Sequence, residues 1–238
     1  MSPAPSRRPF LTARWEHLIV ASYAVPEALL RPLLPPGIDL DFRDGRCFAS
    51  LVGFQFLDTR VLGVGWPWHR DFAEWNLRFY VRRGDTRGVV FVREFVPKPV
   101  VSVMARLIYN EPYRVAKVTG TVKADPDAVT VSYAIPAGGR SHTLWAAAGP
   151  TASPIAPGSD ADFFLNQSWG YGTGHRGRTL KYEVTHPVWD VYPVRERKID
   201  VDWGALYGRE WAVMTGAEPV SVSLAKGSAV AVSPHGRA

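Results

Sequence analysis

Lys98 is the residue whose surroundings point most directly to chemistry. It stands between two prolines, after an apolar run and before another, and the nearest other charge along the chain is Glu94. An ammonium group in apolar surroundings loses hydration, which favours the neutral amine. A neutral amine can attack a carbonyl carbon and form a Schiff base. The alternative is a structural lysine whose stem covers an apolar rim while its charge reaches water.

Polar and apolar side chains alternate along residues 74–81, which is the period of a strand with two different faces. The polar positions are Glu74, Asn76, Arg78 and Tyr80. Polar groups in register could line a barrel interior and act on a small substrate. The alternative is a solvent-facing pair of Glu74 and Arg78, which would contribute little stability.

Three further candidates come from other segments of the chain. Arg14 opens a predicted first strand and could point into the same cavity or into solvent. Trp68 and His186 belong to aromatic clusters beside prolines, in Trp66-Pro67-Trp68-His69 and His186-Pro187-Val188-Trp189. Such clusters usually form corners of a core, but they could also form the wall of an apolar pocket.

Several motifs that would indicate a cofactor do not occur in the sequence. No G-x-G-x-x-G lies between a predicted strand and a predicted helix, and there is no G-x-x-x-x-G-K-[ST] and no G-x-S-x-G. The six histidines include no H-x-x-x-H pair, and the one cysteine, Cys47, excludes an internal disulfide and a cysteine metal cluster. We therefore expect neither a cofactor nor a metal.

Composition and charge narrow the class of partner. The chain has 238 residues and a net charge of +6, with 22 arginines but only six lysines. Hydrophobic residues make up 46%, which is ordinary for a globular protein. No basic stripe, signal peptide or long apolar run occurs, so we expect a cytoplasmic protein that binds neither nucleic acid nor membrane. A small molecule is the expected partner.

Glycine and proline, at 21 and 20 residues, divide the chain into short elements that are mostly strands. Strands are predicted at 15–25, 47–61, 75–82, 89–96, 114–123, 128–135, 141–147, 179–185 and 188–199, with a terminal hairpin of 220–224 and 228–232. Short helices are predicted at 26–34, 100–109, 162–166 and 203–207, and a turn at the glycine-rich run 170–174. This pattern favours a β-barrel or an α+β sandwich over a doubly wound sheet.

The order and spacing of several short segments resemble the DUF2071 (YqjF-like) family over about residues 10–225. The segments are Trp15–Leu18, Tyr23, Leu33–Gly37, Asp44-Gly45, Glu74–Val81, Gly88–Phe91, Ala105-Arg106, Pro112-Tyr113 and His186–Trp189. That family is similar in fold to acetoacetate decarboxylase. The resemblance implies a mainly β, α+β protein: a closed barrel with a few short helices and a central cavity. It also implies a single domain over 1–238, with flexible tails at 1–9 and 233–238.

The resemblance also implies site residues. The segment 93–99 is similar to the decarboxylase segment that carries the Schiff-base lysine, with Lys98 at the nucleophile position. Pro99 stands where those enzymes have a second lysine. Glu74 resembles their pocket glutamate. Arg14 resembles an arginine near their first strand and is the first candidate for binding a substrate carboxylate, with Arg78 as the second.

Two classes of function follow from these residues. One is a cofactor-independent lyase of the decarboxylase or aldolase-dehydratase type, acting on a small oxo acid or carbonyl compound through a Schiff base. Lys98 and Glu74 would be catalytic, and Arg14, Asn76, Arg78, Tyr80, Trp68 and His186 would bind the substrate. The other is a non-catalytic barrel that binds a small molecule, or a cyclase or isomerase that uses the same cavity without an imine. The sequence leaves open whether the chain forms a homo-oligomer.

Overall fold

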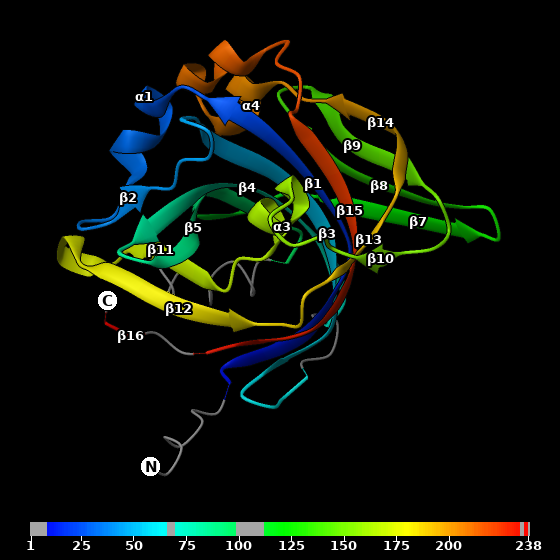
Figure 1. Cartoon of the computed structure of the whole chain (residues 1–238), viewed down its shortest axis with the longest axis horizontal. Coiled ribbons are helices and arrows are strands. Elements are labelled where there is room, and N and C mark those ends of the chain that lie inside the picture. The colour runs from blue at the N-terminus through cyan, green and yellow to red at the C-terminus, as the bar shows by residue number, and fades with distance from the viewer. Residues whose placement is uncertain (1–8, 66–69, 99–111, 234–235, 238) are drawn as a thin grey trace.

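A ring of seven strands organises the part of the chain that the structure describes. The structure is a computed structural model, and it describes residues 9–65, 70–98, 112–233 and 236–237 (Figure 1). In order around the ring the strands are β15 (Ser221–Val232), β1 (Leu11–Val25), β3 (Cys47–Val61), β4 (Phe72–Arg83), β5 (Thr86–Val96), β11 (Trp169–Thr173) and β12 (Thr179–Thr185). The pairing of β12 with β15 closes the ring.

A second, antiparallel sheet covers one side of the ring. It runs in the order β14 (Val194–Asp200), β9 (Arg140–Ala148), β8 (Ala128–Ala137) and β7 (Thr119–Asp125). Shorter strands extend the main sheet: β2 (Asp39–Leu40), β6 (Tyr113–Val115), β10 (Ser153–Pro154), β13 (Asp190–Tyr192) and β16 (Gly236–Arg237). The two sheets share the largest hydrophobic cluster, which joins side chains of β4 to those of β8 and β9.

The alternating pattern of β4 divides the strand between these two environments. Trp75, Leu77 and Phe79 are fully buried in the cluster shared with the second sheet. Because successive side chains point to opposite faces, the even-numbered residues of β4 point to the other side, into the ring. The predicted two-faced strand is therefore confirmed, but both of its faces are buried.

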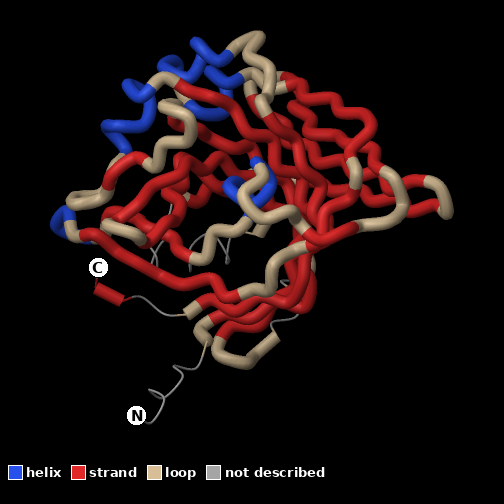
Figure 2. Tube along the Cα trace, in the orientation of Figure 1, coloured by secondary structure: helices blue, strands red, loops and turns tan. Residues whose placement is uncertain are grey.

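Short helices lie at the ends of the ring (Figure 2). They are α1 (Glu27–Leu30), η1 (Arg31–Leu33), α3 (Asp160–Leu165), η2 (His175–Gly177), α4 (Trp203–Tyr207) and η3 (Arg209–Met214). Trp203 of α4 stacks on Trp211 of η3, and the Tyr207 hydroxyl accepts a hydrogen bond of 2.8 Å from the Trp75 indole nitrogen. In the described part of the chain, no helix is long and apolar enough to cross a membrane.

Most predicted elements are confirmed, but two glycine-containing segments were wrongly predicted as turns. The predicted hairpin around 225–227 is one continuous strand, β15, in which Gly227 adopts a φ of +88°. A Cβ at Gly227 would lie 1.9 Å from the Trp15 carbonyl oxygen, so this glycine permits close strand contact and makes no turn. The run 170–174 is largely strand β11, where Tyr182 packs directly against Gly170.

Two predicted strands divide into two separate strands each. The segment 188–199 forms β13 and β14, which belong to different sheets. The segment 114–123 forms β6 and β7, again in different sheets. The helix predicted at 100–109 lies outside the described residues.

Gly53 on β3 offers a test of how the two sheets pack together. A Cβ at Gly53 would lie 2.6 Å from Tyr133 Cδ2 of β8, so Gly53→Ala should destabilise the protein by about 1–3 kcal/mol. Gly204→Ala is the matched control, because its Cβ would meet no atom closer than 3.4 Å. Urea denaturation of both variants checks this, and equal midpoints would contradict the packing described.

Candidate functional site

A line of buried polar side chains runs along the inner face of β4. Glu74 and Asn76 are each 2% exposed, Arg78 is 8% exposed and Tyr80 is fully buried. Polar groups that are this deeply buried need hydrogen-bond partners inside the protein. The structure thus brings together four of the residues that the sequence pattern placed on one face.

Glu74 lies at one end of this line, next to Asn76. Its Oε1 accepts a hydrogen bond of 2.9 Å from Asn76 Nδ2, and its Oε2 accepts one of 3.3 Å from the hydroxyl of Tyr113 on β6. Burial raises the pKa of Glu74 to about 7, against the opposing effects of these two donors and of the Arg78 charge. A carboxyl group with this pKa can both hold and release a proton near neutral pH.

Arg78 and Tyr80 connect the line to helix α3, which lies in the mouth of the ring (Figure 1). Arg78 Nη2 and the Tyr80 hydroxyl both donate to the Phe164 carbonyl oxygen, at 3.0 and 3.2 Å. The Tyr80 oxygen lies 2.6 Å from the Ser50 hydroxyl, which lies 2.7 Å from that of Ser22. Arg78 Nε is buried and has no hydrogen-bond partner among the described residues, so it can still donate to a ligand.

Aromatic rings surround the polar line on the side of Phe72. Phe56 stacks on Phe72 with ring centroids 4.7 Å apart, and Trp15 meets Phe54 edge-on at 5.1 Å. These rings belong to one buried cluster with Trp189. They exclude water from the neighbourhood of Glu74, which is the physical cause of its raised pKa.

Lys98 follows the end of β5 at this same side of the ring. Asn76 pairs with Glu94, and Trp75 pairs with Phe95, so the next rung of the ladder would set Val96 opposite Glu74. Val96 is fully buried in the aromatic cluster. Lys98 lies two residues farther on and is partly buried. Trp68, another predicted binding residue, lies outside the described residues.

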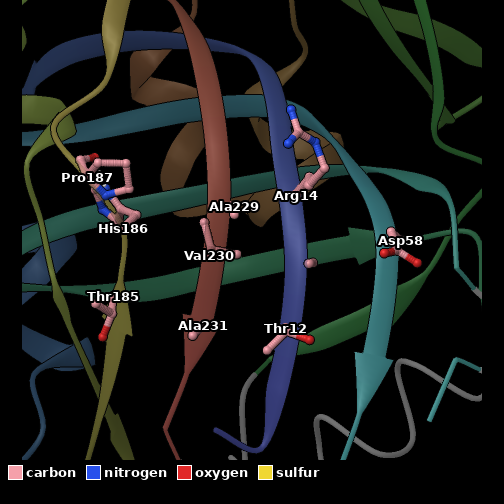
Figure 3. Close-up of a pocket in the computed structure, with 10 residues that line it drawn as sticks. Thr12, Arg14, Asp58, Thr185, His186, Pro187, Ala229, Val230 and Ala231 are labelled. Carbon is pink, nitrogen blue, oxygen red and sulfur yellow. Dashed lines mark hydrogen bonds between the residues drawn. The ribbon is translucent and has the colours of Figure 1, made fainter. Parts of the chain in front are cut away.

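The structure does not bring Arg14 to Glu74. Arg14 lies on the outer face of β1, where its side chain is 55% exposed and forms an ion pair with Glu16. Together with Asp58 and Ala229 it lines an open groove of about 590 Å³ on the outside of the ring (Figure 3). The register of β1 against β3 shifts between residues 16 and 19, and this shift reverses which side chains face inward.

His186 lines the same groove but belongs to the wall of the ring. Its ring stacks on that of Trp189 with centroids 4.1 Å apart, and its Nδ1 donates to the Pro187 carbonyl oxygen at 2.8 Å. Burial lowers the pKa of His186. His186 thus lines the groove while lying within electrostatic reach of Arg78, and Trp189 belongs to the buried aromatic cluster.

Two members of the inner site were not predicted from the sequence. Glu94 is 3% exposed and lies directly across from Asn76, and Tyr113 is hydrogen-bonded to Glu74. Tyr113 entered the family resemblance, and Glu94 was seen only as the nearest charge to Lys98. A regular hairpin of 74–82 with 87–95 would have placed Arg93 opposite Asn76, and it is the register shift between Leu77 and Arg78 that sets Glu94 there.

The raised pKa of Glu74 predicts how stability depends on pH. The folded state holds the Glu74 proton between about 4.5 and 7, where the unfolded chain releases it, so the free energy of unfolding falls as pH rises through this window. Relative to Glu74→Gln, the wild type should lose up to about 1.4 kcal/mol per pH unit there. Urea denaturation at several pH values measures this.

The control for that experiment is Glu196→Gln, which alters an exposed carboxyl group on β14. Its stability curve should run parallel to that of the wild type. A Glu74→Gln curve that also runs parallel to the wild type would mean that Glu74 titrates normally.

Comparisons with known proteins agree with this architecture. The uncharacterised protein YqjF of Bacillus subtilis (strain 168) is 25% identical over 179 residues, covering 74% of this chain and 72% of YqjF. The enduracididine biosynthesis enzyme MppR, complexed with pyruvate, matches with a TM-score of 0.66 and 14% identity over 99% of this chain and 91% of MppR. Acetoacetate decarboxylase from Legionella pneumophila matches with a TM-score of 0.62 and 16% identity, over 99% and 91% of the two chains.

These matches confirm the predicted barrel of the acetoacetate decarboxylase type, and at such identities they concern the fold alone. Family membership rests on the sequence itself. Residues 12–229 match the model of DUF2071, whose description is an uncharacterised conserved protein. The chain therefore belongs to the DUF2071 family.

Proposed function

We propose that the interior of the ring is the active site of a cofactor-independent enzyme that acts on a small oxo acid through a Schiff base on Lys98. The observation that carries this proposal is Glu74, a buried carboxyl group with a pKa near neutrality, next to an arginine and surrounded by aromatic rings. Buried ionisable groups with such shifts cluster at functional sites, because catalytic acids and bases need a pKa matched to their task. Lys98 supplies the amine at the adjoining strand end.

The reaction begins when the Lys98 amine, having given up a proton to solvent, attacks the substrate carbonyl carbon. A C–N bond forms, the carbonyl oxygen takes one proton from the amine nitrogen and one from solvent and leaves as water, and the product is a protonated imine. The iminium then accepts the electron pair of a neighbouring bond, either as carbon dioxide leaves or as an α-proton is removed. Glu74 returns a proton to the resulting enamine carbon in the first case and takes the α-proton in the second.

Arg78, rather than Arg14, is the proposed ligand of the substrate carboxylate. Its guanidinium lies inside the ring, two residues along the strand from Asn76, and its Nε is buried without a described partner. A guanidinium donates two parallel hydrogen bonds to a carboxylate, which fixes the substrate's orientation as well as its charge. Arg14 is on the outer face and already paired with Glu16.

The solved relatives guide the choice of the first probe. MppR has been solved with pyruvate, and also with the condensation product of pyruvate and imidazole 4-carboxaldehyde. Both ligands come from an oxo acid that carries a carboxylate next to a carbonyl. Such a compound matches the proposed pairing of an arginine with an imine-forming amine, so pyruvate is the natural starting probe for this chain.

Borohydride trapping tests the proposed imine. Incubation with pyruvate, other 2-oxo acids or 3-oxo acids, followed by borohydride, should leave one reduced adduct on Lys98, located by intact mass and peptide mapping. Lys98→Ala should abolish the adduct, and Lys98→Arg should as well, because a guanidinium retains the charge but forms no imine. Lys226→Ala, which changes an exposed lysine on β15, should leave trapping unchanged.

The outcomes of this experiment separate the alternatives. Trapping on Lys98, with turnover that falls about 10²–10⁴-fold in Glu74→Gln, supports the proposal. Absence of any Lys98 adduct, with activity that survives Lys98→Ala but not Glu74→Gln, would point to a cyclase or isomerase without an imine. Binding without turnover or adduct would indicate a non-catalytic barrel.

The two arginines make a matched pair for testing carboxylate recognition. Arg78→Gln should weaken the binding of an oxo acid roughly 10- to 100-fold, the value of a hydrogen bond to a charged group, with little effect on a neutral ketone of similar size. Arg14→Gln should change neither. Isothermal titration with both ligands measures this, and equal losses in the two variants would assign the carboxylate to another residue.

A further inference from the structure

The hydroxyl group of Tyr113 lies between two buried carboxyl groups. It is 3.3 Å from Glu74 Oε2, and it is also hydrogen-bonded to the side chain of Glu94. The three residues come from neighbouring strands, because β4 pairs with β5 and β5 pairs with β6, where Glu94 is directly opposite Tyr113. The arrangement therefore follows from strand register and does not depend on a loop.

A phenol has only one hydrogen to donate, so Tyr113 cannot donate to both carboxyl groups at once. Burial and the two neighbouring carboxyl groups raise its pKa well above the usual value, so the phenol keeps that hydrogen. If Tyr113 donates to Glu94, its oxygen can accept a hydrogen bond from a protonated Glu74. If it donates to Glu74, that carboxyl group is satisfied in its ionised form.

We propose that Glu74, Tyr113 and Glu94 form a unit that shares protons, in which Tyr113 and Glu94 act as positioning residues that set the protonation state of Glu74. Glu94 favours the proton on Glu74, both through its negative charge and by receiving the phenol hydrogen. Tyr113 favours the ionised form when its hydrogen turns toward Glu74. The catalytic use of this unit rests on the proposed function, whereas its titration does not.

Other charged and titratable groups around the unit are few in the described part of the chain. Arg78 on β4 stabilises the ionised form of Glu74, and Tyr182 on β12 acts on Tyr113. Lys98 follows the end of β5, the strand that carries Glu94. These groups stay unchanged in the variants below, so their effects cancel in the comparison.

Removing each partner should shift the titration of Glu74 in opposite directions. Glu94→Gln keeps an oxygen that accepts the phenol hydrogen but removes the negative charge, so the midpoint of Glu74 should fall by about one pH unit. Tyr113→Phe removes a donor to the ionised carboxyl group, so the midpoint should rise. A purely structural role of the two residues would not produce shifts of opposite sign.

The test is a pH titration of the protein labelled with ¹³C at the glutamate side-chain carboxyl carbons. The Glu74 signal is assigned by its loss in Glu74→Gln, and circular dichroism confirms that each variant is folded. Glu196→Gln, at an exposed position, is the control and should leave the Glu74 midpoint unchanged. This readout needs neither substrate nor turnover.

A fall in Glu94→Gln together with a rise in Tyr113→Phe supports the unit. Midpoints equal to that of the wild type in both folded variants would overturn it, as would shifts of the same sign. Should Glu94→Gln not fold, Tyr113→Phe decides alone: a rise supports the unit, and an unchanged or lower midpoint overturns it. Absence of imine trapping on Lys98 combined with the opposite shifts would refute the proposed reaction and leave the unit standing.

Discussion

The cost of placing a carboxyl group inside an apolar ring governs the arrangement of this protein's interior. Water is excluded from Glu74 by the aromatic side chains of the neighbouring strands, and the cost of an unpaired buried charge would be several kcal/mol. The protein reduces that cost in two ways. Asn76 and Tyr113 donate hydrogen bonds, and the raised pKa lets the group become neutral. A site that can gain and lose a proton is a direct result of this compromise.

The second sheet and helix α4 make this compromise possible. The outward side chains of β4 are buried against β8 and β9, so the strand is held in place from behind while its inner face carries polar groups. Trp75 and Tyr207 connect the same strand to α4 through a hydrogen bond. An inner site of low dielectric therefore depends also on packing outside the ring.

The sequence predicted those features that repeat over short distances along the chain. The strand at 47–61 and the two faces of 74–81 follow from apolar content and period-two alternation, and both are confirmed. What it could not predict were single backbone irregularities and contacts between distant segments. The positive φ of His17 accompanies the register shift that turns Arg14 outward. No pattern of side chains in the sequence predicts this register shift. The approach of Tyr113 to Glu74 depends on three strands meeting in register, which periodicity in one strand cannot specify.

Helix α3 has a consequence for any ligand that enters the ring. Its Phe164 carbonyl is held by two side chains of β4, Arg78 and Tyr80, instead of by backbone partners. An anion that draws the Arg78 guanidinium to itself must compete with that carbonyl for the same donor. Anion binding at Arg78 and the attachment of α3 are then coupled, and each weakens the other by the same coupling free energy.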